Sequence, residues 1–241
     1  MGKYATSCVY DSLYGCSSNM KGGAMTTKDI MDLLYNKKEF MLKVFATLVT
    51  QLGITYYVMT RYDREKDKDK IVPKTWVLVV LSFAIIFLLA LVPMNIYFKL
   101  GLFTLFSSVT GFLFSSLMKF TNPDLVQLAV AGTMAIFASF FLLGAGLLFS
   151  GIKLGIKTGL FLLFSLLLLI IAMIVSYFTG EYSNSYKLLS GIGLILFSAF
   201  IVYDTNKILQ KDYMGDFVTA SLDYYLDLIN IFIRLLNLNR R

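Results

Sequence analysis

Long apolar runs separated by short polar stretches make up most of the chain after residue 38. Runs of this length cross a bilayer at ~1.5 Å of rise per helical residue. The pattern predicts an all-α fold, a polytopic membrane protein built as a seven-transmembrane-helix bundle. The seven expected helices are Phe40–Thr60, Thr75–Met94, Leu100–Met118, Leu125–Ser150, Thr158–Phe178, Lys187–Leu209 and Phe217–Leu238.

The composition agrees with this class of protein. Of the 241 residues, 57% are hydrophobic and 15% are charged, which is more apolar than a soluble domain of this length. We expect residues 1–38 to form a polar, disordered N-terminal tail and residues 39–241 to form one membrane domain. The tail contains no apolar stretch typical of a signal peptide, so the first membrane helix is expected to direct insertion.

The net charge of +7 does not point to nucleic acid as a partner. Lys and Arg lie between the apolar runs and in the tail, where they are expected to meet anionic lipid headgroups. The 22 basic residues divide equally between the two sides of the predicted membrane domain, so the positive-inside rule gives no orientation.

The tail carries a lipidation pattern. Its start, Met1-Gly2-Lys3-Tyr4-Ala5-Thr6, fits the consensus for N-myristoylation at Gly2, and Cys8 lies close enough for a second lipid. An ordinary disordered tail is the alternative. Cys8 and Cys16 are the only cysteines and the chain has no histidine, so a zinc site is not expected.

The last apolar run differs from the others because it carries Asp223, Asp227, Asn230 and Arg234. Their spacing of i, i+4, i+7 and i+11 puts them on one face of a helix. A charged side chain at the centre of a bilayer costs about 2.5–3.5 kcal/mol on insertion scales, so this face needs a partner or water. Asp204, near the end of the preceding helix, is the candidate partner.

Two adjacent antiparallel helices bring Asp204 and Asp227 to similar depths within the error of predicted boundaries. If the two carboxyl groups meet, they share a proton and form a proton-sensitive latch. When both are ionised, they and the Asn230 carbonyl offer oxygen ligands to a hard cation such as calcium. Arg234 could then compensate the charge. The alternative is structural: Asp204 caps helix-end groups, and Asp227 bonds a neighbouring hydroxyl.

Five segments of the chain resemble the Bax-inhibitor motif family, also called the lifeguard or Golgi anti-apoptotic protein family. The resemblance runs from Phe40 onward, and the tail has no match. The Tyr-Asp-Thr and Tyr-Leu-Asp sequences on the last two helices are its most specific part. The matching segments include FSAFIVYDTNKIL (197–209), ASLDYYLDLINIFIRLL (220–236) and NPDLVQLAVAGTMAIF (122–137).

The resemblance implies a seven-helix, pH-sensitive calcium leak that requires no cofactor, with Ca²⁺ as the transported ion. It places the family's paired aspartates on Asp204 and Asp227. It further implies an endoplasmic reticulum or Golgi membrane in a eukaryotic or viral setting, or a bacterial plasma membrane. Eukaryotic and viral relatives restrain cell death by lowering stored calcium. The expected partners are the lipid bilayer, calcium ions and other membrane proteins.

The chain departs from the family pattern in two places. Relatives with a defined latch carry an arginine in the second helix, whereas Thr75–Met94 contains no basic residue. Asp223 is an additional carboxylate, which either enlarges a cation site or faces water.

Two other functions compete with the calcium leak. Intramembrane aspartyl proteases also use two helix-borne aspartates, and Tyr203-Asp204 fits one of their motifs. Their second motif, Gly-x-Gly-Asp, is absent around Asp223 and Asp227, so we do not expect an enzyme. A non-conducting membrane scaffold, in which the acidic pair is purely structural, is the other alternative.

Overall fold

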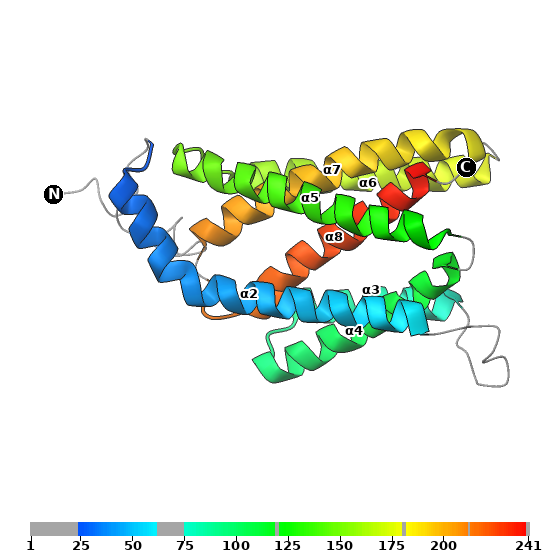
Figure 1. The fold of residues 1–241 in the computed structure, drawn as a ribbon, viewed down its shortest axis with the longest axis horizontal. Helices are drawn as coiled ribbons and strands as arrows, with labels where there is room; N and C mark the ends of the chain where they lie inside the picture. The colour runs from blue at the N-terminus through cyan, green and yellow to red at the C-terminus, as the bar shows by residue number, and fades with distance from the viewer. Residues whose placement is uncertain (1–23, 62–74, 119–120, 180–181, 212, 240–241) are drawn as a thin grey trace. The chain divides into compact units, whose positions relative to one another are not determined.

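The computed structural model describes residues 24–61, 75–118, 121–179, 182–211 and 213–239. The predicted lipidation sites Gly2 and Cys8 lie outside these residues. In the described part of the chain, all regular secondary structure is helical, which confirms the all-α prediction (Figure 1). The seven helices are α2 (Thr27–Arg61), α3 (Thr75–Leu91), α4 (Ile96–Met118), α5 (Pro123–Phe149), α6 (Ile156–Phe178), α7 (Tyr182–Gln210) and α8 (Phe217–Asn239).

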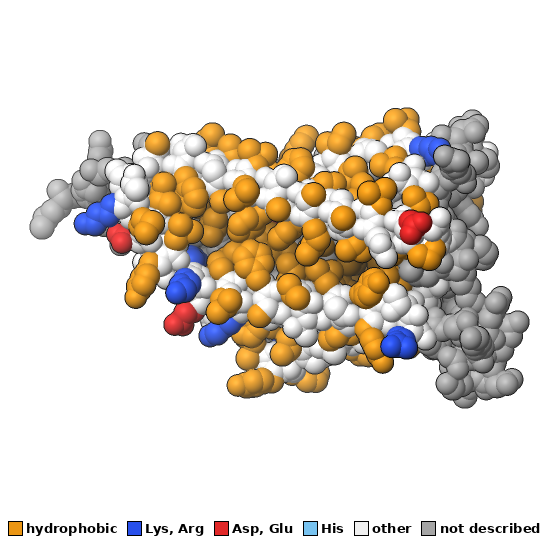
Figure 2. Space-filling view, viewed as in Figure 1, with side chains coloured by type: hydrophobic (Ala, Val, Ile, Leu, Met, Phe, Trp, Pro, Cys, Tyr) orange, Lys and Arg blue, Asp and Glu red, His pale blue; other side chains and the backbone are white. Residues whose placement is uncertain are grey.

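Five of these helices, α2 and α4 to α7, are long and apolar enough to cross a membrane. Helix α3 is also apolar but has only 17 residues. Helix α8 has a comparable length to α4, and it carries the charged stripe found in the sequence. The chain is therefore a multi-pass membrane protein. On the face drawn in Figure 2, hydrophobic side chains predominate along the helices, and charged side chains lie toward the helix ends.

The first helix begins at Thr27, well before the predicted start near Phe40. The cause is a capping box before the apolar run. The Thr26 hydroxyl accepts from the Asp29 amide at 3.3 Å, and the Asp29 carboxylate accepts from the Thr26 amide at 3.0 Å. These contacts satisfy amide groups that have no partner inside the helix. Helix formation therefore extends into polar sequence.

The chain divides into two compact units, each described by itself. The first unit comprises residues 1–40 and 135–215, and the second comprises residues 41–134 and 216–241. The division into two units does not test whether residues 39–241 form a single membrane domain, which stays a prediction.

In the first unit, α6 lies along α7 (Figure 1). Leu162, Leu169 and Leu196 form a buried cluster between these two helices. The C-terminal part of α5 ends at a positive-φ glycine, Gly151, with φ of 85°. The Ile152 amide closes this end by donating to the Leu147 carbonyl at 2.8 Å, an arrangement typical of a glycine-terminated helix.

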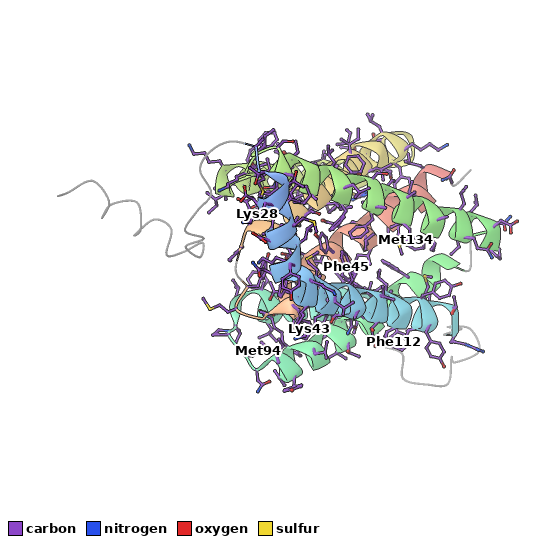
Figure 3. All side chains as sticks on the ribbon, turned by 60° about the vertical axis from the view of Figure 1, so that its left-hand side comes forward. Lys28, Lys43, Phe45, Met94, Phe112 and Met134 are labelled. Carbon is purple, nitrogen blue, oxygen red and sulfur yellow. The ribbon has the colours of Figure 1, made fainter. Side chains whose placement is uncertain are left out.

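In the second unit, α3 lies beside α4, and α4 packs against α8. Aromatic rings fill much of the space around α8. Phe103 and Phe106 of α4 contact the Tyr225 ring with centroids 5.2 and 5.7 Å away. Phe45 of α2 (Figure 3) stacks on Tyr224 at 6.3 Å. Helix α8 is thus surrounded by side chains of its own unit along its N-terminal half.

Candidate functional site

Asp204 is a buried carboxylate on α7, with 6% of its surface exposed. Lys207, one turn further along the same helix, donates to its Oδ1 at 3.3 Å. The lysine side chain is less buried and also lies over the Tyr203 ring, 5.9 Å from its centroid. A cation one turn away offsets part of the cost of burying a negative charge. Asp204 therefore has a local counter-ion within its own unit.

Asn206, two residues after Asp204, attaches α7 to the connection between α5 and α6. Its Oδ1 accepts from the Leu154 amide at 2.8 Å. Its Nδ2 donates to the Ile152 carbonyl at 3.0 Å and to the Gly144 carbonyl at 3.2 Å. The side chain is fully buried. One carboxamide thus binds two backbone groups of the α5–α6 connection and one carbonyl of α5, and it fixes the part of α7 that carries Asp204.

Two glycines allow α7 to approach its neighbours closely at this level. A Cβ atom at Gly144 of α5 would lie 2.6 Å from the Val202 carbonyl oxygen and 2.9 Å from the Thr205 Cβ. A Cβ atom at Gly159 of α6 would collide with the Tyr203 hydroxyl. Neither position leaves room for a side chain, so the small-residue packing expected for membrane helices is present here.

The predicted polar stripe lies on α8 in the second unit. Asp227 and Arg234 are buried, with 4% and 8% of their surfaces exposed. Asp223 and Asn230 are half-buried. The Asn230 side chain donates to the Leu226 carbonyl of its own helix at 2.7 Å. Two of the three charged groups of the stripe are thus buried, and the third, Asp223, is partly exposed.

The N-terminus of α8 is held by Asp216 and Lys99. The Asp216 carboxylate accepts from the Thr219 amide at 3.0 Å and from the Lys99 ammonium at 2.6 Å. Burial alone would raise the pKa of Asp216, but the hydrogen bonds from Lys99 and Thr219 outweigh burial and lower that pKa below its ordinary value of 3.8. Asp216 therefore acts as an ionised helix cap.

A buried polar seam joins α2, α4 and α8 in the second unit. The Thr55 hydroxyl lies within hydrogen-bonding distance of the Gln51 and Ser107 carbonyls, at 3.0 and 3.1 Å, and can donate to either. The Tyr225 hydroxyl lies 2.6 Å from the Thr55 oxygen, and either hydroxyl can be the donor in that contact.

Gln51 extends the polar seam by one turn. Its Nε2 donates to the Thr104 hydroxyl at 3.1 Å, and that hydroxyl itself donates to the Leu100 carbonyl. Because the Thr104 hydroxyl already donates elsewhere, it must accept from Gln51, and this sets the orientation of the Gln51 carboxamide. The buried Gln51 Oε1 then has no hydrogen-bond partner among the described residues.

The predicted site residues fall into two groups. Asp223, Asp227, Asn230 and Arg234 share α8, whereas Asp204 belongs to the other unit. The meeting of Asp204 and Asp227 stays a prediction. Among the described residues, no three Asp, Glu, Cys or His side chains gather in a way that would hold a metal ion.

Sequence reasoning missed three residues that position these carboxylates. Lys207 could have been found, because its i+3 spacing from Asp204 puts it on the same helix face. Asn206 and Lys99 carried no such signal, since their partners lie 52 or more residues away in the chain.

Comparison with known proteins identifies the family. Residues 37–240 match the family model described as "Inhibitor of apoptosis-promoting Bax1". The chain belongs to the Bax inhibitor family. The match includes both α7 and α8, and it begins inside α2 close to the first apolar run.

Curated members of this family are similar over long stretches. The Golgi anti-apoptotic protein of vaccinia virus (strain Lister) is 35% identical over 151 residues, 61% of this chain and 58% of the viral protein. Bax inhibitor 1 of Schizosaccharomyces pombe is 26% identical over 205 residues, 83% of this chain and 75% of the yeast protein. Bax inhibitor 1 of Drosophila melanogaster is 28% identical over 223 residues. The chain thus spans little more than half the length of the viral relative.

Proposed function

We propose that this Bax inhibitor family protein is a proton-sensitive calcium leak, in which Asp204 and Asp227 are the titrating groups. The observation that carries the proposal is the burial of both carboxylates, at 6% and 4% exposure, on the last two helices of a membrane protein. Ionisable side chains inside a membrane protein are expensive to bury and commonly mark an ion or proton pathway. The family membership supports the same reading.

In this proposal the two carboxyl groups share a proton in the closed state. Loss of that proton would leave two like charges in a poorly solvated region, which favours their separation. The separated carboxylates, with the oxygen of Asn230, would then offer transient oxygen ligands to Ca²⁺ as it passes. Lys207 and Arg234 are the basic groups that would balance the charge of Asp204 and Asp227.

The buried polar seam supports an ion leak over a purely structural bundle. Gln51, Thr55 and Tyr225 put hydroxyl and amide groups in the interior of the second unit, where apolar side chains would pack at lower cost. Such groups are compatible with the passage of water or a hydrated ion.

The name of one relative supports a proposal about the membrane and the physiological role. The viral relative is named a Golgi anti-apoptotic protein. We propose that this chain resides in an endoplasmic reticulum or Golgi membrane if its host is eukaryotic, or in a plasma membrane if it is bacterial. In a eukaryotic host, lowering stored calcium would restrain cell death. It acts as a channel and not as an enzyme.

The test is calcium efflux from proteoliposomes over about pH 6 to 8, where a shared proton can titrate. We expect a leak whose pH midpoint moves by about one unit or more in Asp204→Asn and in Asp227→Asn. Asp223→Asn, one turn away on α8 and half-buried, is the matched control and should retain the wild-type midpoint.

Three outcomes would contradict the proposal in different ways. An unchanged pH profile in both variants would exclude these carboxylates as the sensors. A complete absence of leak would favour the membrane scaffold. Cleavage of a transmembrane peptide that is lost in Asp204→Asn would favour the aspartyl protease.

A further inference from the structure

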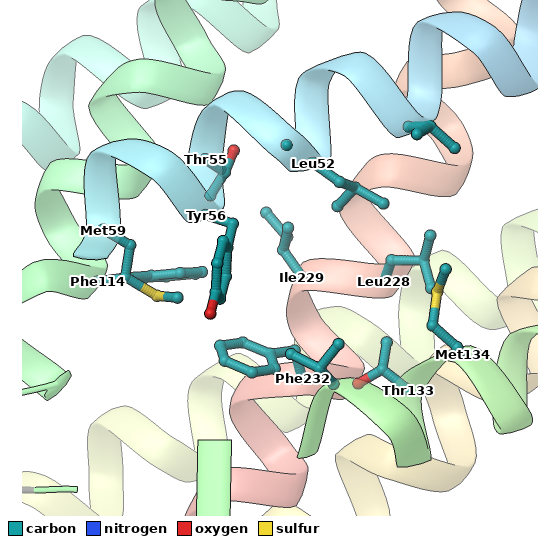
Figure 4. A pocket seen from close by; sticks show the side chains of 13 residues that line it. Leu52, Thr55, Tyr56, Met59, Phe114, Thr133, Met134, Leu228, Ile229 and Phe232 are labelled. Carbon is teal, nitrogen blue, oxygen red and sulfur yellow. The ribbon is translucent and has the colours of Figure 1, made fainter. Parts of the chain in front are cut away.

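The second unit contains a pocket of about 330 Å³ (Figure 4). Four helices of this unit contribute to it. Its size is at the lower end of the roughly 300–1,000 Å³ typical of small-molecule sites. The lining residues are Val49, Leu52, Gly53, Thr55, Tyr56 and Met59 of α2, Phe114 of α4, Val130, Thr133 and Met134 of α5, and Leu228, Ile229 and Phe232 of α8.

The lining excludes charged and strongly polar ligands. It contains no ionisable carboxylate, ammonium or guanidinium group. Of its three hydroxyl groups, that of Thr133 donates to the Ala129 carbonyl at 2.7 Å, that of Thr55 belongs to the polar seam, and that of Tyr56 is the third. An ion, a phosphate or a nucleotide would lose its hydration here without gaining a charged partner. The chemistry therefore fits a hydrocarbon.

The mouth of the pocket is lined by exposed side chains of two helices. Val49 and Tyr56 of α2 are 62% and 50% exposed, and Met134 of α5 is 50% exposed. Both helices are long and apolar enough to cross a membrane. The pocket thus opens on exposed faces of two candidate membrane-spanning helices, and the interior of a bilayer consists of acyl chains.

Gly53 lines the pocket and has free space where a side chain would lie. A Cβ atom at Gly53 would meet no atom within 4 Å, so the backbone there is not packed against a neighbour. Gly111, which is not in the wall, shows the opposite case. Its Cβ would lie 2.8 Å from the Thr55 carbonyl oxygen, so it serves close packing of α4 on α2. Glycine inside a helix costs about 1 kcal/mol relative to alanine, and at Gly53 tight packing does not account for it.

We propose that this pocket binds one acyl chain of a membrane lipid or fatty acid. Helix α8 contributes Leu228, which directly follows Asp227 in the sequence, so a bound chain would contact the turn that carries this carboxylate. The proposal does not depend on calcium leak, because it concerns binding alone.

The test is photocrosslinking of a diazirine-labelled palmitic acid to the purified full-length protein in nanodiscs, followed by peptide mapping. We expect labels on pocket residues such as Tyr56, Met134 and Phe232. Gly53→Leu should fill the space without a clash and reduce this labelling about tenfold or more, the effect of roughly 1.4 kcal/mol in binding. The control is Gly101→Leu on α4, which is also open and lies outside the pocket.

Three results would overturn the proposal. One is equal labelling of the pocket in Gly53→Leu and wild type. Another is labelling spread evenly over all lipid-facing helices, which would indicate ordinary bilayer contact. The third is pocket labelling by a sterol photoprobe with none by the fatty acid, which would exclude an acyl chain as the ligand. Thermal unfolding of both variants checks that each remains folded.

Discussion

Helices α7 and α8 each carry a buried aspartate, but they are anchored by different chemistry. Helix α7 is held by the neutral carboxamide of Asn206, which binds three backbone groups of its unit. Helix α8 is held by an ion pair between Asp216 and Lys99 at its N-terminus. One anchor has no titratable group, whereas the other can be weakened by acid.

Because neither anchor titrates near pH 7, a change of activity with pH near neutrality can be assigned to other groups. The lowered pKa of Asp216 keeps it ionised well below pH 7, and Asn206 does not titrate. A response between about pH 6 and 8 therefore requires other groups, and Asp204 and Asp227 are the buried candidates on these two helices.

The largest effect is expected from Asn206→Ala, which tests the neutral anchor. Removal of the carboxamide leaves the Leu154 amide and the Ile152 and Gly144 carbonyls without this partner. The Gly144 carbonyl keeps its place in the ladder of α5, so two groups are left unpaired. At about 1–3 kcal/mol for each buried group left unpaired, the loss of stability should be about 2 kcal/mol or more. Thermal unfolding in detergent micelles, followed by circular dichroism, measures it. A change within experimental error would contradict the role given to Asn206.

Lys99→Met should have the next largest effect and tests the ionic anchor. It removes a charged hydrogen bond to Asp216 and another to the Thr219 hydroxyl at 2.5 Å. Hydrogen bonds to charged groups are worth about 1.5–3 kcal/mol, and we expect a loss in that range from the same unfolding measurement. If Lys99→Met unfolds like wild type, the ion pair does not hold α8.

The pH dependence of this anchor has a definite sign. Because the folded-state pKa of Asp216 lies below 3.8, its stabilisation is complete above that value and is lost as the pH falls through the folded pKa. Asp216→Asn keeps a good helix cap but removes the charge. Wild type should therefore lose more stability than Asp216→Asn on acidification from about pH 5 to about pH 2. Equal acid losses in the two proteins would contradict this.

Gly144→Ala should destabilise the first unit by about 1–3 kcal/mol, the usual range for overpacking. The added methyl group would lie 2.6 Å from the Val202 carbonyl oxygen and force α5 away from α7. Gly146→Ala is the matched control, because it lies two residues further along α5 and its added Cβ would meet no atom within 4 Å. It should be neutral or slightly stabilising. Similar unfolding midpoints for both variants would refute the close approach at Gly144.

The smallest effect is expected from Tyr225→Phe on α8. This change removes one hydroxyl, while Thr55 keeps its carbonyl partners. The expected loss is about 0.5–1.5 kcal/mol, typical of one hydrogen bond. The ring contacts with Phe103 and Phe106 remain, so a much larger loss in unfolding experiments would show that the polar seam acts as a connected network.

The helices were largely predictable because apolar length alone indicates a membrane helix. The observed ranges of α3, α6 and α8 differ from the predicted ones by three residues or fewer at each end. The start of α2 was wrong because the capping box of Thr26 and Asp29 lies in polar sequence, outside the hydrophobic signal. Hydrophobicity reports membrane contact, whereas a helix end depends on where the free amide groups find partners.

The candidate site was predictable only in part, for a similar reason. The periodic spacing of Asp223, Asp227, Asn230 and Arg234 defines a helix face, and two of these four side chains are buried. The anchors could not be read from spacing. Lys99 and Asp216 are 117 residues apart, and nothing in the local sequence of either indicates the other. Their pairing depends on how α4 packs against α8.

The length of α2 has a practical consequence for membrane topology. Its 35 residues extend over ~52 Å at the usual helical rise, whereas the hydrocarbon core of a bilayer is ~30 Å thick. The polar first turns, which include Asp32 and Lys38, are therefore expected to lie outside the hydrocarbon core. A membrane-impermeant label on a single cysteine at Asp32, in a chain whose Cys8 and Cys16 are replaced, would reveal in which compartment these turns lie. That one observation would set the direction of every later crossing, which the even distribution of basic residues leaves open.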